Sequence, residues 1–331
     1  MKSILQPGIK APQFTLPAVN QEYEVSVSGQ LEHVTAILFF GSEVNNEIAG
    51  QLTGFQERLQ DFEKHNAMVI AISDAAPGDL RKLAEKEGIN FPFIADSEPR
   101  GYVARSFGVV SNENIQPAVF IVDQEGLIRR VYCPEPGKDL PNPAMVLRAI
   151  IKLANTPKPP LVTPEDWRLG SPEAPVILIE YGDYQCGHCR QLYQVIRKLL
   201  PLYEEKVQFV FRHYPLRHLH PQAELAAEAA EAAGAQGKFW EMHARMFEAE
   251  NALERENLVE YAREIGLDIE KFTQDLDNHR FANEVKEDFR GATRNKIKFP
   301  PAFFINYIFF DEPPTEETIR ARIDSLLACL A

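Results

Sequence analysis

Short apolar runs alternate with amphipathic segments along the first half of the chain. Runs of strand length lie at 36–40, 68–72, 91–95, 118–122 and 127–132. Between the first two runs, apolar residues from Leu52 to Phe62 recur at spacings of three and four, which predicts one helix over about 48–65. A second helical segment is predicted near 80–87. Strands that alternate with helices predict an α/β unit whose sheet is covered on both faces.

The second half of the chain repeats this alternation, with one large interruption. Strand-like runs lie at 176–181, 207–211 and 303–310, and amphipathic helices are predicted around 192–200 and 319–330. A block from about 221 to 290 is helical in character throughout, with an alanine-rich stretch as its strongest part. This block is therefore expected to be inserted between the second strand and the third.

A proline-rich stretch separates the two halves. Six prolines occur in the twenty residues from Thr156 to Pro175. Proline fixes φ and removes a hydrogen-bond donor, so the stretch cannot continue a helix or a central strand. The prediction is a domain at 1–155, a linker at 156–175 and a second domain at 176–331.

Composition and charge narrow the class of protein. The chain has 331 residues, of which 45% are hydrophobic and 25% charged, as in a globular protein, and this excludes an intrinsically disordered chain. A formal net charge of −13 argues against binding to nucleic acid. No apolar run reaches the length of a membrane span, and Pro7 and Lys10 interrupt any signal-peptide pattern at the start. A cytoplasmic protein without membrane partners is predicted.

Two of the four cysteines form the motif Cys186-Gly187-His188-Cys189. At the start of a predicted helix, the first thiol lies at the positive end of the helix dipole, which favours the thiolate. This interaction is worth about 1–2 kcal/mol, or roughly one pKa unit, so His188 and its neighbours must supply the rest. Cys186 is the predicted nucleophile, and Cys189 is the resolving thiol that breaks a mixed disulfide.

Two other interpretations of the cysteine pair are open at this point. A CxxC can be half of a zinc site, but zinc needs four ligands and usually a second close pair. Cys133 and Cys329 are isolated in the sequence, so no metal site is predicted. The second alternative is an inert structural disulfide, for which a strand-to-helix turn is an unusual position.

Three segments of the second half carry specific motifs. They are RLGSPEAPVILIEYGDYQCGHCRQL, RHYPLRHLHPQAELAAEAAEAAGAQGKFWEMH and FPPAFFINY. From Trp167 to Leu330, the chain closely resembles the DsbA-like thiol:disulfide oxidoreductases of thioredoxin fold. The resemblance implies that the helical block is the family's insertion and that Pro301 is its cis-proline, which binds extended substrate backbone. Gly187 and Pro300 join Pro301 in the implied substrate-binding set, although Pro300 replaces the family's usual Thr or Val.

An acid precedes the motif at the position where thioredoxin-fold proteins carry a buried carboxyl group. Glu180 lies six residues before Cys186. A carboxyl group buried near Cys189 would have a raised pKa and could accept its proton. The alternative is a strand-edge residue paired with a cation. Asp183, on the loop before the motif, is interpreted as a turn or surface acid.

The remaining histidines and cysteines are assigned structural roles. The closely spaced His213, His218 and His220 fall in segments where the family uses them for capping and packing rather than for a metal. Cys329 lies in the apolar pattern of the last helix and is expected to be a buried small hydrophobe. Cys133 follows a strand end and is expected to be more exposed.

The first half carries a different set of motifs. They are PGIKAPQFTLPAV, ILFFGSE, GFQERLQDFEKHNAMVIAIS, INFPFIAD, YVARSFGVV and AVFIVDQEGLIRRVY. From Gln6 to Leu153 they resemble a peroxiredoxin domain of the AhpC/TSA type. Where that family has its peroxide-reducing cysteine, this chain has Gly-Ser-Glu-Val-Asn-Asn-Glu, and Ser42 cannot replace a thiolate. Pro117 stands near the family's arginine position and is a second candidate for a cis bond. The domain is expected to be catalytically inactive.

These observations predict an α/β protein of two tandem thioredoxin-like domains, the second with an all-helical insertion. The expected activity is disulfide exchange with protein or peptide substrates through the CGHC motif, without a cofactor and with an unidentified redox partner. The sequence leaves a homodimer open. It also leaves open whether the enzyme acts as a reductase or isomerase, as expected in a cytosol, or as an oxidase. Two rivals are a chaperone-like binding module and a thiol peroxidase that uses Cys186.

Overall fold

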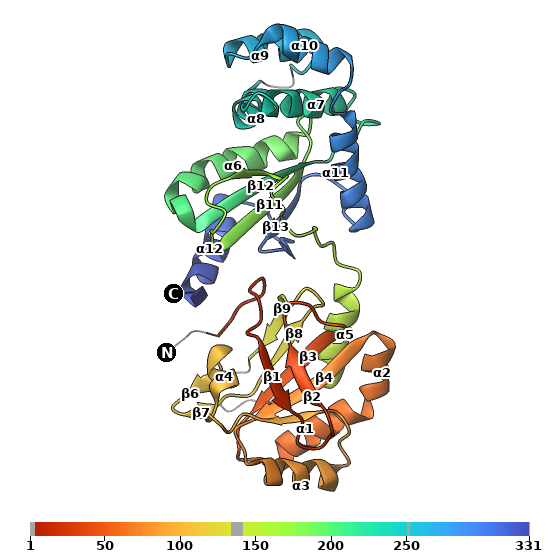
Figure 1. Cartoon of the computed structure of the whole chain (residues 1–331), viewed down its shortest axis with the longest axis vertical. Coiled ribbons are helices and arrows are strands. Elements are labelled where there is room, and N and C mark those ends of the chain that lie inside the picture. The colour runs from red at the N-terminus through yellow and green to blue at the C-terminus, as the bar shows by residue number, and fades with distance from the viewer. Residues whose placement is uncertain (1–3, 134–141, 250–251, 331) are drawn as a thin grey trace. The chain divides into compact units, whose positions relative to one another are not determined.

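The computed structural model describes residues 4–133, 142–249 and 252–330. The chain divides into two compact units, one formed by the residues up to Thr156 and the last residues from Ala328, the other by Pro157–Leu327. Each unit is built on a five-stranded mixed sheet with helices packed against it (Figure 1). The predicted α/β class is confirmed for both.

The N-terminal unit has a sheet of order β5-β4-β3-β8-β9. β3 pairs in parallel with β4, and β4 with β5, whereas β8 runs antiparallel to both β3 and β9. The elements in chain order are β1 (Phe14–Pro17), β2 (Glu24–Val27), β3 (Val34–Phe40), α1 (Asn46–Glu57), α2 (Leu59–Lys64), β4 (Ala67–Ser73), α3 (Pro77–Glu87), β5 (Phe93–Ala95), α4 (Tyr102–Ser106), β6 (Val110–Ser111), β7 (Asn114–Ile115), β8 (Ala118–Val122), β9 (Ile128–Tyr132) and α5 (Pro143–Leu153).

Two expectations for this unit are wrong. The single helix predicted over 48–65 is two helices, because Arg58 leaves the helical region with φ −105° and ψ 7°. The apolar face nevertheless continues across the break, where the rings of Phe55 and Phe62 stack with centroids 5.8 Å apart, so the sequence pattern cannot reveal it. Pro117 is not in a cis bond; the cis bonds among the described residues precede Pro99 and Pro301.

The C-terminal unit has a sheet of order β10-β12-β11-β13-β14. β11 is parallel to β12 and antiparallel to β13, and the two edge strands are both antiparallel to their neighbours. The elements are β10 (Trp167–Leu169), β11 (Val176–Gly182), α6 (Gly187–Tyr203), a 3-10 turn (Glu204–Lys206), β12 (Val207–His213), α7 (Ala223–Gly234), α8 (Phe239–Glu248), α9 (Arg255–Glu264), α10 (Ile269–Asp277), α11 (Ala282–Arg294), β13 (Ala302–Ile305), β14 (Ile308–Phe309) and α12 (Glu316–Leu330).

Helices α7–α11 form the predicted helical insertion between β12 and β13. Figure 1 shows α7–α10 stacked together beyond one end of the sheet, and α11 running back beside it. α7 contacts α8, α9 and α10, and α11 contacts both α7 and β12. The insertion is therefore anchored to the sheet through α11, next to the strand that neighbours β11.

The proline-rich stretch that was predicted as a linker contains a strand. β10 pairs antiparallel with β12 at the edge of the sheet. Its Trp167 stacks on Phe239 of α8 with ring centroids 4.3 Å apart and donates a hydrogen bond to Glu231 at 2.8 Å. Flanking prolines exclude a central strand but tolerate a short edge strand, which is the position β10 takes.

Alternation along β11 separates the two faces of the sheet. Ile179 and Tyr181 belong to an apolar cluster that also contains Ala292 of α11. Glu180 therefore faces the opposite side. There Gly182 leaves essential room, because a Cβ at that position would lie 2.4 Å from the Phe211 ring and 2.9 Å from Glu180 Oε1. A polar side chain is thus built into the interior two residues before the central strand ends.

Candidate active site

The turn from β11 into α6 places both cysteines of the CGHC motif. The strand ends at Gly182, three residues follow, and Cys186 is the N-cap residue of α6 with φ −79° and ψ 122°. Cys186 retains 6% exposure, whereas Cys189, on the first turn, is fully buried. Both thiols are free. The first thiol is thus the one nearer the helix end and the surface.

A loop that lies 114 residues downstream in the sequence also reaches the Cys186 thiol. Cys186 Sγ lies 3.8 Å from the carbonyl oxygen of Pro300, to which the protonated thiol can donate a hydrogen bond. The bond between Pro300 and Pro301 is cis, as the resemblance implied. Pro300 is buried and Pro301 half-buried, while Gly187 is exposed with open space beside its Cα. The residues predicted to bind substrate therefore lie beside the more accessible thiol.

The surroundings of Cys186 favour its thiolate. The pKa of this thiol falls from 9.0 to about 5 because the Cys189 side chain donates a hydrogen bond to the sulfur, and the backbone N–H groups of Cys189 and His188 add to the effect, while burial opposes it. His188 acts here through its backbone amide. Its side chain is exposed, and the contribution of the imidazole beside the sulfur stays a prediction.

Cys189 has the opposite character. Burial raises the pKa of its thiol well above 9.0, and the hydrogen bond to Cys186 and the charge of Glu180 raise it further. The backbone N–H of Asp183 approaches Cys189 Sγ at 3.4 Å and opposes this effect. One thiol of the pair is therefore ionised at neutral pH and its neighbour is protonated.

Glu180 is a buried acid on the central strand. It is 1% exposed, and its Oε1 has no hydrogen-bond partner among the described residues. Burial raises the pKa of its carboxyl group well above 4.5, and the negative charge of Cys186 raises it further. The alternative of a strand-edge residue paired with a cation is wrong, because β11 lies between β12 and β13 and no cation pairs with Glu180 in the described part of the chain.

Asp183 is not the surface acid that the sequence suggested. It is 1% exposed. Its carboxylate accepts hydrogen bonds from the backbone of Gln185 and of Leu216 and from Nδ1 of His220, each at 2.8 Å. The bond to Gln185 is the turn that was expected. Burial follows from the loop after β12, which folds back over Asp183 and cannot be foreseen from local spacing.

An aromatic cluster lies on the Glu180 side of the sheet. The sequence places Phe239, His243 and Phe247 on one helix face as core residues, and their burial confirms this, but it did not show that Tyr184 joins them. Tyr184 and His243 are buried, and the tyrosine hydroxyl pairs with His243 Nδ1 at 3.1 Å. Burial, with the nearby His213, lowers the pKa of His243 to about 3, so this imidazole is neutral. The rings that pack together here are those of Tyr184, Phe211, Phe239, His243 and Phe247. Tyr184 and His243 are 59 positions apart in the sequence, so no local motif could show that they are in contact.

The other singled-out residues lie outside the thiol pair. His213 is buried and pairs with Glu231 at 3.0 Å, and His218 is exposed. Among the residues that the structure describes, no group of three or more metal-ligating side chains comes together. Cys133 is exposed, as expected. Cys329 is half-buried rather than buried, so the expectation for it is wrong.

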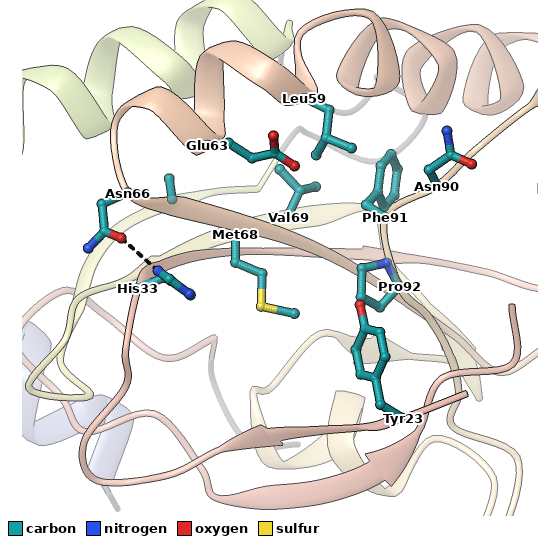
Figure 2. Close-up of a pocket in the computed structure, with 11 residues that line it drawn as sticks. Tyr23, His33, Leu59, Glu63, Asn66, Met68, Val69, Asn90, Phe91 and Pro92 are labelled. Carbon is teal, nitrogen blue, oxygen red and sulfur yellow. Dashed lines mark hydrogen bonds between the residues drawn. The ribbon is translucent and has the colours of Figure 1, made fainter. Parts of the chain in front are cut away.

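The corresponding turn of the N-terminal unit has no thiol. After β3, Ser42 is exposed, and α1 begins with Asn45 as its N-cap, whose side chain accepts from the Ile48 N–H at 2.8 Å. A pocket of about 280 Å³ lies elsewhere in this unit, against β4 and α2 (Figure 2). Its polar rim includes His33, whose Nδ1 is 2.7 Å from Asn66 Oδ1. No residue of 41–49 lines the pocket.

Comparison with known families gives a separate match for each of the two units. Residues 162–325 match the family model described as Thioredoxin, of the DsbA-like kind, and residues 7–131 match the AhpC/TSA family. The C-terminal half of the chain is thus similar to DsbA-like proteins, and the N-terminal half is similar to AhpC/TSA proteins. The predicted pair of thioredoxin-like folds is thereby confirmed. The DsbA-like match includes all of β11, the CGHC motif and the cis-proline loop.

Curated relatives share a part of this sequence. The chain is 42% identical over 137 residues to a Na(+)/H(+) antiporter NhaA 1 of Salinispora arenicola, covering 41% of this chain and 21% of that protein. It is 38% identical over 159 residues to NhaA 3 of Salinispora tropica, covering 48% and 24%. The chain thus spans less than a quarter of the length of these relatives.

Solved structures similar to each half include oxidised BdbD of Bacillus subtilis and AhpC of Mycobacterium tuberculosis. BdbD is 23% identical with a TM-score of 0.47, over 52% of this chain and 98% of that one. AhpC is 17% identical with a TM-score of 0.41, over 46% and 94%. The match of the DsbA-like domain to its family supports a thiol–disulfide oxidoreductase in general terms. No helix in the described ranges combines the length and hydrophobicity needed to cross a bilayer.

Proposed function

We propose that the chain exchanges disulfides with protein or peptide substrates through Cys186 and Cys189. The Cys186 thiolate attacks a substrate disulfide, forms a mixed disulfide and expels one substrate thiolate, which takes up a proton. Cys189 then loses its proton, attacks Cys186 and releases the second substrate thiolate. The substrate gains two electrons and the dithiol loses two as its own disulfide forms. Run in reverse, the same steps oxidise a substrate dithiol.

The opposite ionisation of the two thiols is the observation that carries this proposal. The nucleophile in exchange must be a thiolate at working pH, which the pKa of about 5 at Cys186 provides. A resolving thiol must instead stay protonated until the mixed disulfide forms, which the raised pKa of Cys189 provides. A structural disulfide would need neither property.

Glu180 is the proposed acceptor of the Cys189 proton. It lies on the buried side of the site, and its charge raises the pKa of Cys189, so the two groups are electrostatically linked. A carboxyl group with a raised pKa is a suitable base near neutral pH. The orphaned Oε1 leaves an acceptor atom unused by the described residues.

The direction of electron flow follows from the reduction potential and the compartment. A potential near −180 mV lies about 80 mV above a cytosolic glutathione poise near −260 mV, which favours the dithiol roughly 500-fold. In the cytoplasmic location that the sequence predicts, the protein would act as a reductase or isomerase. In an oxidising compartment it would act as an oxidase.

Insulin reduction and a glutathione titration test the proposal. Wild type should reduce insulin and show one two-electron transition by alkylation mass shift. Cys186→Ser should lose both, while Cys133→Ser, which removes an exposed thiol, should retain them. A Cys186→Ser protein that still reduces insulin would overturn the proposal. Suppression of aggregation as the sole activity would establish a binding module, and fast peroxide consumption by Cys186 would establish a thiol peroxidase.

A further inference from the structure

Asp183 is connected to both cysteines and to the loop opposite them. Its backbone N–H donates to Cys189 Sγ at 3.4 Å, and its carbonyl oxygen accepts the N–H of Cys186 at 3.1 Å. Its carboxylate accepts hydrogen bonds from the backbone N–H of Gln185 in the same turn and from that of Leu216 in the loop after β12. Through these hydrogen bonds, Asp183 contacts both cysteines at the start of α6 and also the loop after β12.

A second contact fastens the same two segments. The side-chain oxygen of Gln185 accepts the N–H of Gln222 at 2.9 Å, directly before α7. The turn that precedes Cys186 is thus joined to the connection between β12 and α7 at both Asp183 and Gln185. Because these bonds fix the backbone, the carboxylate of Asp183 occupies a defined place beside the thiols.

Besides two backbone N–H groups, a histidine side chain pairs with the carboxylate of Asp183. The Asp183 side chain is fully buried, and its ion-pair partner is His220, which is 24% exposed and 2.8 Å away at Nδ1. Besides Asp183, the titratable groups whose charges act most strongly on the thiols are Glu180, which raises the pKa of Cys189, and the other thiol of the pair. The negative charge of Asp183 opposes the Cys186 thiolate, and the donor on His220 offsets that charge.

We propose that Asp183 and His220 form a positioning pair that sets the balance between the dithiol and the disulfide of the CGHC motif. This inference rests on the proposed function, because it concerns the equilibrium of the same two cysteines. Asp183 destabilises the thiolate of the reduced form, and His220 moderates that effect. Neither residue touches the substrate bond that breaks.

The equilibrium that the pair controls is exchange with glutathione. Two glutathione thiols give up two electrons and two protons and join as glutathione disulfide. The Cys186–Cys189 bond breaks and takes up the two electrons. Cys189 takes up one of the two protons, and the other goes to solvent because Cys186 is a thiolate above its pKa. Any group that stabilises this thiolate shifts the equilibrium to the dithiol and makes the protein more oxidising.

Two substitutions should shift this equilibrium in opposite directions. Asp183→Asn removes the charge and keeps the acceptor for Gln185, so we expect a threefold to tenfold shift to the dithiol, ~15–30 mV at about 30 mV per decade. His220→Phe keeps a ring and removes the donor, which leaves Asp183 less compensated, so we expect a twofold to threefold shift to the disulfide. Alkylation of Cys186 as a function of pH should show its pKa falling in the first variant and rising in the second.

The opposite signs distinguish electrostatics from simple loosening of the turn. Loss of order at the start of α6 would weaken the hydrogen bonds to Cys186 in both variants and shift both toward the disulfide. Asp268→Asn is the matched control, because that carboxylate caps α10 through Lys271 in the same way but does not contact the cysteines. It should leave the equilibrium unchanged.

The outcomes separate this inference from the proposed function. Absence of any glutathione-dependent transition in wild type would refute the proposed function. A normal wild-type transition with shifts of the same sign, or with no shift in either variant, would refute the role of Asp183 and His220 alone. If Asp183→Asn does not fold, His220→Phe alone can still refute the inference, because electrostatic positioning requires a rise in the Cys186 pKa and an unchanged pKa excludes it.

Discussion

The two units share a four-stranded core. In the N-terminal unit β4, β3, β8 and β9 are adjacent, and in the C-terminal unit β12, β11, β13 and β14 take the same order and the same relative directions. They differ in the fifth strand, since β5 is parallel to β4 whereas β10 is antiparallel to β12. They differ far more where the central strand passes into the helix.

The two units differ in the residues at the junction between the central strand and the following helix, although they share the same strand order. Counting back from the strand end, Glu180 of β11 corresponds to Leu38 of β3, and both are buried. The helix that follows is capped by a cysteine in one unit and by Asn45 in the other. A side-chain cap stabilises the start of α1, while α6 uses its free N–H groups for a thiolate instead. The shared topology thus supports either a stable turn or a reactive one.

Of the changes considered, removing the resolving thiol should have the largest effect on the activity of the C-terminal unit. Cys189→Ser keeps the Cys186 nucleophile, so the first attack should proceed and the mixed disulfide should accumulate. We expect multiple turnover to fall to background and a covalent adduct with substrate to appear on non-reducing gels. An adduct that clears as fast as in wild type would mean that another thiol resolves it; Cys329→Ser serves as the control and should turn over normally.

Making the C-terminal strand resemble the N-terminal one is the next test. Glu180→Leu removes the proton acceptor, so resolution should slow by about 10- to 100-fold. The same change should raise the free energy of unfolding by roughly 1–3 kcal/mol, because an unpaired buried polar atom is removed. Glu180→Gln, of equal size, should slow resolution without the full gain in stability. A normal rate in both variants would exclude the relay.

The raised pKa of Glu180 also leads us to expect that the free energy of unfolding depends on pH. Its pKa is raised in the native state from 4.5, so the native protein holds this proton more tightly than the unfolded chain. Its contribution to stability is complete below about pH 4.5 and is lost as pH rises through the native pKa. Denaturant unfolding at several pH values should show that Glu180→Leu lacks this decline.

The ionisation of Cys186 should be visible in alkylation rates. With a pKa of about 5, its rate with iodoacetamide should be flat between roughly pH 6.5 and 8, where an ordinary thiol near 8.5 would still rise steeply. Because this pKa is lowered in the native state, the reduced protein should lose stability relative to the oxidised one as pH falls from 9 through about 5. A steep rise in rate near pH 8 would contradict the assignment.

The smallest expected effect comes from placing a cysteine at the other helix start. Asn45→Cys removes the side-chain cap of α1 and should cost about 0.5–2 kcal/mol of stability. The new thiol gains the helix end but no neighbouring thiol or buried acid, so its pKa should fall by about one unit at most. Ser42→Cys, before the cap, is the control. A thiol at position 45 as acidic as Cys186 would show that the helix start alone suffices.

Local patterns predicted the central strands of both sheets and the CGHC helix. They missed β10 and read β13 and β14 as one strand over 303–310. The surroundings of the thiols depended on distant segments. Glu180 could be proposed from its distance to Cys186, and the structure adds its burial between β12 and β13. Asp183 was misjudged because Leu216 and His220, which cover it, lie more than thirty residues away. The break at Arg58 was missed for the opposite reason, since a helix and a kinked helix present the same apolar spacing.

The insertion between β12 and β13 also has a consequence for synthesis. The carbonyl of Pro300 that contacts Cys186 lies 114 residues downstream. At about 5–20 residues per second, a ribosome takes roughly 6–23 s to make that interval. Until then the nascent chain contains the thiol pair without β13 or the proline loop. We expect Cys186 in such a chain to be open to premature disulfide formation with other thiols, and completion of the sheet to reduce that risk.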